Sequence, residues 1–416
     1  MPENPSSQLE KYLPPPVLAL VKIAGLSASD LGQELYIVGG VVRDLFLGRA
    51  NFDFDLVVEG DAISLAGKLA KDSQAKLRIH TRFGTAKLNY PGFSLDLATA
   101  RSETYSKPGA LPTVKPGSLK DDLIRRDFSI NAMALHLNPQ RFGELIDLYH
   151  GKDDLERRLI RILHPKSFID DATRILRAVR YEQRLGFKLE AETEKLLRRD
   201  VAMLHTISGD RIRHELELML KEDEPERAIR RAEEMGVLSQ LHPSLKGNGW
   251  LSKMFAKARQ IGKLTSLSTI YLCLLIYNLS EKANEQFISR LNFPKNSSQV
   301  ARQTLQLKAQ LHNLANPGME PSDIYRLLHG YSATAIQANA LASESPVTSQ
   351  HLNLYLNKLR YVKPLLNGED LKKMGIAAGP KIGDILSALH KAKLDGKVHT
   401  RKDEEKLIHS WRNNYS

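Results

Sequence analysis

Two aspartates stand on either side of one phenylalanine, directly before an apolar run. The segment reads Asp53-Phe54-Asp55 and continues into Leu56-Val57-Val58. If it forms a strand, alternation places both carboxylates on the same face. Neighbouring carboxylates repel each other unless a cation lies between them, and Mg2+ prefers such oxygen ligands together with substrate phosphates. The sequence therefore predicts that Asp53 and Asp55 hold magnesium at the start of a core strand.

A third aspartate, Asp96, has a similar apolar setting within residues 93–97. Three carboxylates on neighbouring strands can hold two metal ions for in-line displacement at a phosphate. A lone Asp-x-Asp pair is more often part of a solvated loop. Here a glycine turn precedes the pair and a predicted core strand follows it, which favours the metal site. We therefore expect Asp53, Asp55 and Asp96 to be catalytic.

The turn before the aspartates suits a polyphosphate. Gly39 and Gly40 follow a predicted strand, and Arg43 comes next at the start of a predicted helix. Glycines let the backbone approach a ligand closely, and a helix amino terminus beside an arginine binds phosphate groups. Further along, Arg126 and Asn131 in the segment 125–134 can contact phosphates and a ribose hydroxyl. A plain strand-to-helix turn and a solvated helix start are the alternatives.

Residues 170–181 predict a helix on which Asp171 and Arg174 are adjacent, because they are three positions apart. Cytosine and adenine both present an amino donor beside a ring-nitrogen acceptor, and uracil and guanine present the reverse. A carboxylate accepts from the amino group and a guanidinium donates to the ring nitrogen, so this pair can select C and A without a template. Arg177 and Arg180 follow in steps of three. An ordinary salt-bridged helix is the alternative.

The order of the predicted elements indicates a mixed α/β head followed by an all-helical remainder. Short β-rich runs occur at 36–38, 54–58, 76–80, 85–89 and 93–97, with a helical pattern at 62–71. Further helices are expected at 212–220, 228–235, 268–277, 297–311 and 382–393.

The bulk composition favours a nucleic-acid partner. The chain has 416 residues and a formal net charge of +12, although a basic protein without such a partner is the alternative. Its one cysteine, Cys273, excludes an intrachain disulfide and a cysteine-based zinc cluster. The first 16 residues are polar and proline-rich, and no apolar run approaches ~20 residues. We therefore expect no signal peptide, no membrane span and a cytoplasmic location.

The motifs, in this order, resemble those of the class II tRNA nucleotidyltransferases and the related bacterial poly(A) polymerases. Gly39-Gly40-x-x-Arg43-Asp44 with Asp53-x-Asp55 is similar to their motif A, and residues 125–134 resemble motif B. Residues 147–161 resemble the linker between head and neck, Asp171-x-x-Arg174 the base-selecting motif, and 208–220 the neck helix. The resemblance implies a polymerase-β-like mixed sheet in the head, followed by all-α neck, body and tail domains.

The resemblance also implies a role for each matching residue. It implies that Gly40 and Arg43 bind the triphosphate and that Asp53 and Asp55 bind magnesium. It implies that Arg126 contacts the nucleotide and that Asp171 and Arg174 read its base. Arg177 and Arg180 would complete the base pocket. One departure is Asp170, where many members have Glu. It leaves the selecting pair unaffected.

Residues 101–112 occupy the place of the family's flexible loop and depart from the loop of the full CCA-adding enzymes. Together with residues 60–63 they look more like the branch that adds only the terminal A. We expect a template-independent enzyme that adds CMP and/or AMP from CTP or ATP to the tRNA 3′ end, leaning to AMP. A CC-adding or full CCA-adding enzyme, a poly(A) polymerase and a non-catalytic RNA-binding protein are the alternatives. We infer no protein partner.

The carboxy-terminal segment resembles a family tail that touches tRNA, and a plain solvated hairpin is the alternative. The residues expected to contact RNA are Lys372, Lys373, Lys381, Lys391, Lys393, Lys397 and Arg401. The predicted domains are an N-terminal segment (1–25), a catalytic head (26–150), a neck with the base-selecting motif (151–222), a helical body (223–345) and this basic tail (346–416).

Overall fold

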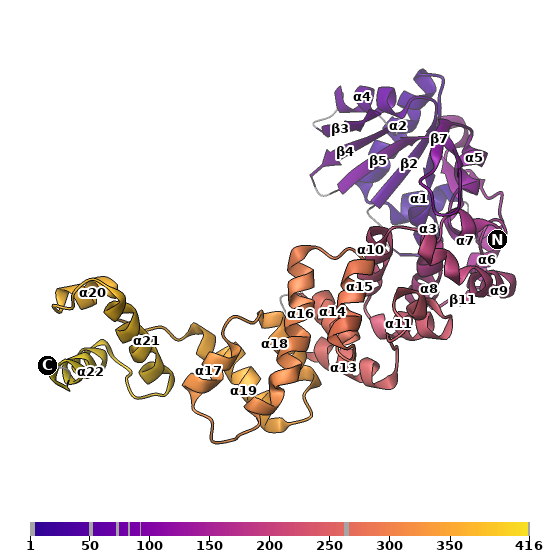
Figure 1. The fold of residues 1–416 in the computed structure, drawn as a ribbon. Coiled ribbons are helices and arrows are strands. Elements are labelled where there is room, and N and C mark those ends of the chain that lie inside the picture. Colours follow the sequence, from indigo (N-terminus) through magenta and orange to yellow (C-terminus); the bar gives the residue numbers. More distant parts are fainter. Residues whose placement is uncertain are drawn as a thin grey trace. The chain divides into compact units, whose positions relative to one another are not determined.

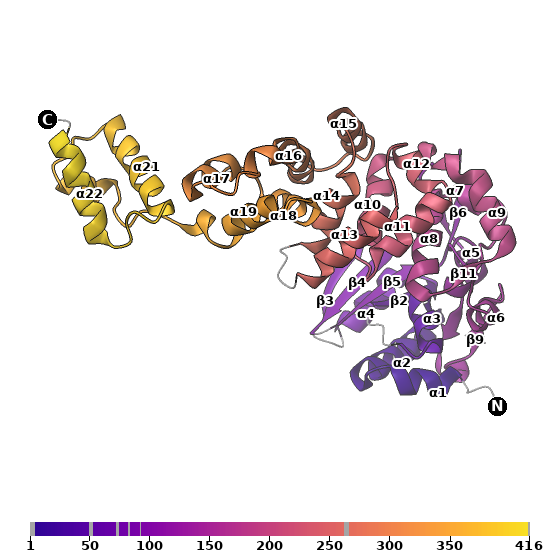
Figure 2. The same cartoon turned by 90° about the horizontal axis from the view of Figure 1, so that it is seen from below.

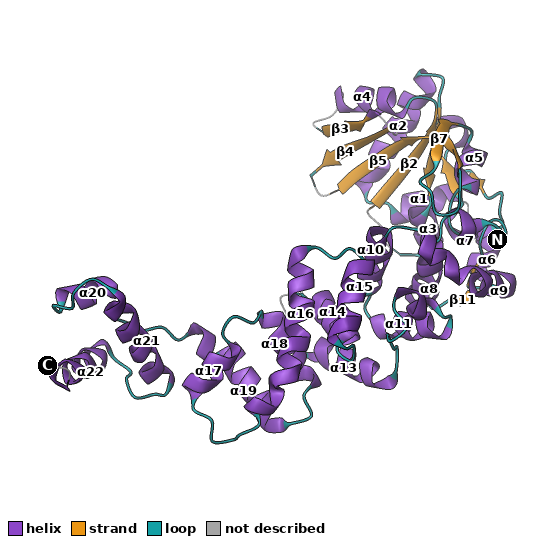
Figure 3. Cartoon of the chain, viewed as in Figure 1, coloured by secondary structure: helices purple, strands orange, loops and turns teal. Residues whose placement is uncertain are grey.

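The structure is a computed structural model that describes residues 5–49, 53–71, 75–81, 84–91, 93–261 and 266–414. The chain forms two compact units, residues 1–219 with 227–240, and residues 220–226 with 241–416. The described strands lie in the first unit, and the described elements of the second unit are helical (Figure 3). This order confirms an α/β head followed by a largely helical remainder. The predicted all-α neck also contains a small parallel sheet of β10 (Leu159–Ile160) and β11 (Lys188–Leu189), so that part of the prediction was wrong. Within the described ranges, no helix is both long and apolar enough to cross a membrane.

A seven-stranded mixed sheet forms the centre of the first unit. Its order is β3-β4-β5-β2-β1-β8-β9, with β2 and β5 parallel and the other neighbours antiparallel. The strands are β1 (Glu34–Val38), β2 (Asp53–Glu59), β3 (Lys76–His80), β4 (Thr85–Tyr90), β5 (Phe93–Thr99), β8 (Ala134–His136) and β9 (Leu145–Ile146). All five β-rich runs expected from the sequence fall within these strands.

One helix decides which face of the sheet carries the carboxylates. Helix α4 (Ala62–Lys71) lies against β3, β4 and β5 (Figure 1). Its Leu65 and Leu69 are buried, as is Leu88 of β4. Strand alternation turns Asp55 and Asp96 away from this apolar face. The face opposite α4 therefore holds the predicted catalytic residues.

Helices and a small hairpin surround the sheet in the first unit. They are α1 (Pro5–Tyr12), α2 (Pro15–Asp30), α3 (Gly40–Phe46), β6 (Arg101–Thr104), β7 (Thr113–Pro116), α5 (Leu119–Ile124), α6 (Gly151–Glu156), β10 (Leu159–Ile160), α7 (Ser167–Asp170), α8 (Thr173–Leu185), β11 (Lys188–Leu189), α9 (Ala191–Asp200), α10 (Gly209–Met219) and α11 (Pro225–Glu234). The segment expected to be a flexible loop is the β6–β7 hairpin. A Cβ at Gly109 in its loop would lie 2.4 Å from Oγ1 of Thr206, so the loop packs tightly against the residues that precede α10.

The second unit is built from helices with two apolar clusters. Its helices are α13 (Gly249–Gln260), α14 (Leu267–Ile276), α15 (Glu281–Arg290), α16 (Lys295–Gln310), α17 (Pro321–Leu328), α18 (Ala333–Ala342), α19 (Pro346–Asn357), α20 (Gly368–Lys373), α21 (Pro380–Leu394) and α22 (Arg401–Asn414), while α12 (Val237–Leu241) ends the first unit. One cluster joins Ile324 of α17 to Leu352 and Tyr355 of α19. Helix α19 thus packs with helices of the predicted body, although the sequence division placed it in the tail.

The tail is a small helical module with its own core and a buried charge. Helices α21 and α22 lie side by side as the expected hairpin (Figure 2), and Leu389 and Ile408 are buried between them and α20. Glu404 is fully buried and accepts hydrogen bonds from the backbone of Leu365 and Leu366. Lys393 Nζ lies 2.8 Å from its carboxylate. The buried carboxylate therefore ties α22 to the chain segment that leads into the tail.

Helix α2 packs against β1 and α4, so most of the predicted N-terminal segment is part of the head. A Cβ at Gly25 would lie 1.9 Å from the backbone oxygen of Leu137. We expect Gly25→Ala to lower the free energy of unfolding by about 1–3 kcal/mol through overpacking. The matched control is Gly67→Ala in α4, where nothing lies within 4 Å. Alanine is the better helix former there, by up to about 1 kcal/mol. Urea denaturation of both variants tests this, and equal stabilities would contradict it.

Candidate active site

A cavity of about 610 Å3 opens in the first unit beside the sheet and the neck helices. It is lined by described residues from β2, β6, the β1–α3 turn, α8 and α10. They are Gly39, Gly40, Val41, Arg43, Asp55, Glu103, Tyr105, Pro112, Arg125, Arg126, Asp127, Asn131, Asp171, Arg174, Arg177, Tyr181, Arg184 and Arg211. Seven of these described residues are arginines and four are acidic, so the cavity suits a ligand with high negative charge.

The β1–α3 turn leaves room for the side chain of Arg126, because Gly39 in this turn has no side chain of its own. Gly39 has φ 78°, and a Cβ there would lie 2.8 Å from Nη1 of Arg126. Arg43, in the first turn of α3, is buried, and its Nε and Nη2 each donate to the Asp44 carboxylate at 2.9 Å. The guanidinium of Arg126 therefore lies directly over the predicted phosphate-binding turn, and Arg43 is held rigidly behind it.

Asp127 connects three parts of the site through one buried carboxylate. Its Oδ2 accepts from Nε and Nη2 of Arg177 at 2.8 and 2.6 Å, and its Oδ1 accepts from Nδ2 of Asn131 at 3.0 Å. Asn131 Oδ1 in turn accepts from Nη1 of Arg43 at 2.7 Å. Burial acts to raise the pKa of Asp127, but the charge of Arg177 and the hydrogen bonds from Asn131 and Arg177 outweigh it and lower the pKa. The carboxylate thus stays ionised.

The predicted base-reading residues are held by other groups rather than by each other. Asp171 Oδ1 accepts from the backbone N–H and the hydroxyl of Thr173 at 2.9 and 2.7 Å, and from Nη2 of Arg211 at 2.8 Å. Arg174 is buried, and its Nη1 donates to Oγ of Ser167 at 2.7 Å. Its Nη2 donates to the backbone oxygen of Arg125. Both side chains line the same cavity with fixed orientations.

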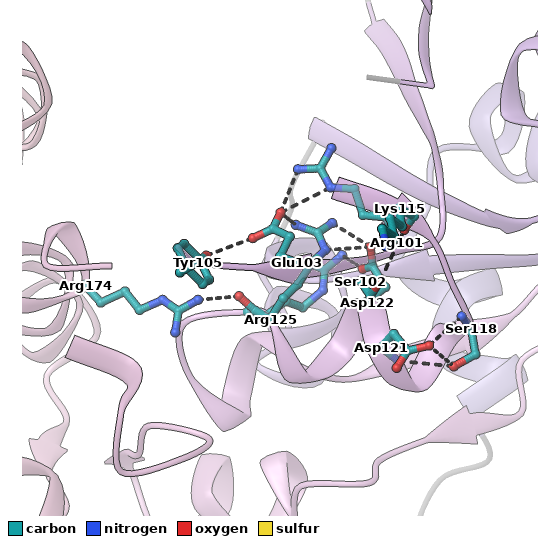
Figure 4. Close-up of polar contacts among 11 residues, drawn as sticks. Arg101, Ser102, Glu103, Tyr105, Lys115, Ser118, Asp121, Asp122, Arg125 and Arg174 are labelled. Carbon is teal, nitrogen blue, oxygen red and sulfur yellow. Dashed lines mark hydrogen bonds and ion pairs between the residues drawn. The ribbon is translucent and has the colours of Figure 1, made fainter. Parts of the chain in front are cut away.

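The β6–β7 hairpin is joined to the cavity wall by Glu103 (Figure 4). One oxygen of Glu103 accepts from Arg101 at 3.0 Å and from Arg125 at 3.1 Å, and the other accepts from the Tyr105 hydroxyl at 2.9 Å. Asp122, fully buried in α5, accepts from both Arg125 and Arg126. Burial and the Glu103 carboxylate raise the pKa of Tyr105, which keeps its hydroxyl protonated. Glu103 therefore joins the hairpin to Arg125, and Asp122 holds Arg125 and Arg126 at the cavity wall.

The carboxylates expected to bind metal are adjacent in the sheet register. Asp55 of β2 is the Cα partner of Asp96 on the parallel strand β5, so the two share one face. Asp96 Oδ2 lies 2.7 Å from Nζ of Lys87 on β4. The side chain of Asp53 lies outside the described residues, although its backbone begins β2. Among the described residues, no group of three or more His, Cys, Asp or Glu side chains is arranged to hold a metal ion.

Comparison with known proteins agrees with this arrangement. Family models described as "Poly A polymerase head domain", "Probable RNA and SrmB- binding site of polymerase A" and "tRNA nucleotidyltransferase domain 2 putative" match residues 35–161, 186–247 and 264–410. An A-adding tRNA nucleotidyltransferase of Halalkalibacterium halodurans is 33% identical over 93% of this chain and 90% of its own length. The chain belongs to the tRNA nucleotidyltransferase family.

Other members of this family differ in length. An A-adding tRNA nucleotidyltransferase of Geobacter sulfurreducens is 34% identical over 96% of this chain, but the chain spans only about half of that relative, 47% of its length. Among solved structures, the Thermotoga maritima CCA-adding enzyme complexed with tRNA is 32% identical, with a TM-score of 0.78 and 98% and 99% of the two chains covered. Membership of the tRNA nucleotidyltransferase family confirms the resemblance found in the motifs.

The tRNA nucleotidyltransferase fold brings together most of the predicted nucleotide-binding residues. Gly39, Gly40, Arg43, Asp55, Arg126, Asn131, Asp171, Arg174 and Arg177 all line the cavity. Arg180 lies elsewhere: it is buried, with Nη2 3.2 Å from Oε2 of Glu215 in α10. Asp96 borders a neighbouring cavity that also contains Asp55. Roles for these residues stay predictions, and the geometry favours a supporting position for Arg180.

Several described residues that line the cavity carried no assigned role in the sequence, among them Glu103, Asp127 and Arg211. Asp127 follows two arginines directly, so a buried counter-charge could have been suspected from the sequence. Glu103 and Arg211 contact partners 22 and 40 residues away in the chain, and no local pattern reports such a contact.

The tail residues divide into exposed and paired side chains. Lys373, Lys381, Lys391 and Lys397 are exposed. Lys372 forms an ion pair with Glu369, and Arg401 with Asp370. Lys393 is paired with the buried Glu404, so it stabilises the fold of the tail instead of facing solvent. The predicted RNA contacts are therefore best carried by the exposed lysines.

The lowered pKa of Asp127 predicts a pH-dependent contribution to stability. Its folded pKa lies below the ordinary value of about 3.9, so its stabilisation is complete above that pH and is lost as pH falls through the folded value. We expect Asp127→Asn to destabilise by roughly 3–5 kcal/mol at neutral pH, because Arg177 loses its buried partner. As the pH falls below the ordinary aspartate pKa and through the lower folded pKa of Asp127, the difference from the unaltered protein should shrink.

The control for this prediction is Asp30→Asn, which removes an exposed ion pair with Lys68 in the same unit. Such pairs contribute about 0–1 kcal/mol. Urea denaturation from about pH 2 to about pH 7 measures both variants. A loss for Asp127→Asn that is small, or that does not change with pH, would contradict the prediction.

Proposed function

We propose that the chain transfers nucleotides from ATP and/or CTP to the 3′ end of tRNA in the cytoplasm, and that AMP is the nucleotide it adds. Relatives named A-adding tRNA nucleotidyltransferases in three organisms support the choice of AMP. Solved relatives are titled as complexes of CCA-adding enzymes with ATP, with CTP and with tRNA. The observation that carries the proposal is the single cavity that contains Asp55, the arginines and the pair Asp171 and Arg174.

The way Asp171 is held explains how it could read a base. All three of its described donors bind Oδ1, so among the described residues Oδ2 is left to accept from an exocyclic amino group. Nη1 of Arg174 donates to the hydroxyl and the backbone oxygen of Ser167, and Nη2 donates to Arg125, so Nε and the second N–H of Nη2 can donate to a ring nitrogen. Uracil and guanine would leave both side chains unpaired in a partly closed site, which is costly.

The arginines bind and orient the triphosphate in this proposal. Arg126 lies over the glycine turn, and Asp122 holds Arg125 and Arg126 in place. Mg2+ is the cofactor we propose for Asp53 and Asp55, with Asp96 as a further ligand. The pairing of Asp55 with Asp96 across parallel strands supplies oxygen donors of the kind that a hard cation prefers. Bound there, the ion would stabilise the negative charge that develops at the transferred phosphate.

Three alternatives remain distinct from A addition. The match to a model described as a poly(A) polymerase head domain favours a polymerase that extends RNA repeatedly. A CC-adding or full CCA-adding enzyme would share the same base-reading pair, because cytosine and adenine present the same donor and acceptor pattern. A non-catalytic RNA-binding protein would have no use for the carboxylate pair beside the arginine-lined cavity.

The test uses three tRNAs that end before C74, after the first C and after CC, each with labelled ATP or CTP. We expect one AMP on the tRNA ending in CC and no CMP on any of the three. A ladder of A residues would favour poly(A) polymerase, and CMP transfer would favour CC or CCA addition. Asp55→Asn should abolish transfer while the melting temperature stays near that of the unaltered protein. Full activity of Asp55→Asn with magnesium would contradict the metal assignment.

Base choice gives a second test of the same site. Arg174→Ala should reduce discrimination against UTP and GTP by about 1–3 kcal/mol, because one half of the base-reading pair is removed. The control is Arg198→Ala, an exposed arginine of α9 paired with Glu194. Comparing kcat/KM for the four nucleoside triphosphates measures the effect. If the ratio for ATP over UTP is the same in both variants, Arg174 does not read the base.

A further inference from the structure

The face of the sheet that carries the carboxylates continues as a row of charged side chains across three more positions. The register pairs Asp55 of β2 with Asp96 of β5, Asp96 with Lys87 of β4, and Lys87 with Arg78 of β3. Paired residues on neighbouring strands lie on the same face. Strands are about 4.8 Å apart, so the row reaches roughly 10 Å from Asp96 to the edge of the sheet. Two acids at the catalytic end are thus followed by two cations.

The outer half of this face is purely cationic or neutral. Strands β3 and β4 read Lys-Leu-Arg-Ile-His and Thr-Ala-Lys-Leu-Asn-Tyr, with no acidic residue in either. Lys76 and Arg78 are exposed, and neither forms an ion pair within the described part of the chain. His80 is exposed on the same face, paired in register with Thr85. We define the open face as Lys76, Arg78, His80, Thr85 and Lys87.

A second cavity connects this open face to the catalytic carboxylates. It has a volume of about 380 Å3 and is lined by His80, Thr85 and Lys87 together with Asp55 and Asp96. Arg125 and Arg126 border both this cavity and the larger one that we assign to the nucleotide. The carboxylates therefore stand between two cavities, of which one holds the base-reading pair and the other leads out across β4 and β3.

Charges on an edge strand often serve only to prevent sheets from joining edge to edge. That explanation covers Arg78 and Lys76 on β3. Edge protection does not explain Lys87, because this residue lies on the interior strand β4. Nor does it explain the cavity that Lys87 and Asp55 both line. A cationic face that begins at a phosphoryl-transfer site complements a polyanion with one end at that site.

We propose that the open face binds the backbone phosphates of the single-stranded RNA end just upstream of the nucleotide that receives the transfer. Arg78 and Lys76 contact the phosphates, and Lys87 bridges Asp96 and the RNA. A single strand fits better than a duplex, because a cationic groove that follows one backbone is typical of single-strand binding. The inference rests on the proposed function, since it assigns the second substrate of that reaction to a place on the sheet.

The test measures binding of a short single-stranded RNA ending in CC by fluorescence anisotropy, without nucleotide, at several salt concentrations. Arg78→Gln combined with Lys76→Gln should weaken binding several-fold and lower the log–log salt slope by about 0.7 for each lost phosphate contact. Arg78→Lys should retain most of the affinity. The matched control is Lys71→Gln, an exposed cation at the end of α4 on the covered side of the sheet. It should bind RNA like the unaltered protein.

The kinetic readout separates this site from the nucleotide site and from the tail. The double variant should raise the KM for RNA and leave the KM for ATP unchanged. Lys381→Gln with Lys391→Gln in the tail should weaken binding of full-length tRNA but not of the short RNA. Failure of the unaltered protein to transfer nucleotides would refute the proposed function, while the anisotropy result would still decide the open face.

Two results would overturn the assignment of the open face. One is that the double variant and Lys71→Gln bind the short RNA with equal affinity and equal salt slope. Absence of measurable RNA binding by the unaltered protein counts as the same result. The other is self-association that depends on Arg78, seen by analytical ultracentrifugation together with unchanged RNA affinity. That result would assign the face to a second copy of the chain.

Discussion

The carboxylate of Asp127 is the interaction on which the rest of the catalytic unit depends. It accepts hydrogen bonds from Arg177 of α8 and from Asn131, which lies in the segment after α5. Asn131 in turn accepts a hydrogen bond from Arg43 of α3. Three elements that are far apart in the sequence thus meet at one buried charge. Without it, helix α8 and the β1–α3 turn would have no direct polar connection through these groups, and Arg177 would lose the nearer of its two acidic partners, Asp127 and Glu215.

The same principle recurs at Arg125 and Arg126. Asp122 holds Arg125 and Arg126, and Glu103 holds Arg125 as well. An arginine fixed by a buried carboxylate loses little conformational entropy when a ligand binds, because its side chain is already ordered. Its remaining N–H groups stay available to phosphate oxygens. The acids of the cavity therefore orient the arginines, and the excess of arginines still leaves a positive field that suits a polyanion.

Tight packing and buried charge also decide how the peripheral segments are held. The β6–β7 hairpin meets Thr206 so closely at Gly109 that a side chain there would clash. In the tail, Glu404 joins the start of α20 to α22 through backbone N–H groups and Lys393. This use of Lys393 shows that a basic segment is not a uniform surface. Some of its cations neutralise internal acids, and only the remaining ones face solvent.

The sequence by itself determined the family, the order of most elements and many of the residues that line the cavity. Gly39, Asp55, Asp171 and Arg174 lie in short motifs whose chemistry depends on local spacing, and alternation along a strand or a helix is enough to place them on one face. The five predicted strands were confirmed for the same reason, since period-two patterning is a local signal.

Only the tertiary structure decided which groups orient that site. The contacts of Glu103 with Arg125, of Arg211 with Asp171 and of Lys393 with Glu404 join residues that no periodic pattern relates. Arg180 follows the helical step of Arg174 and Arg177, yet it is buried against Glu215, because the direction of a side chain depends on which neighbour covers it. The row from Asp55 to Arg78 likewise exists only through strand order and register, and the long-range pairing of strands sets both.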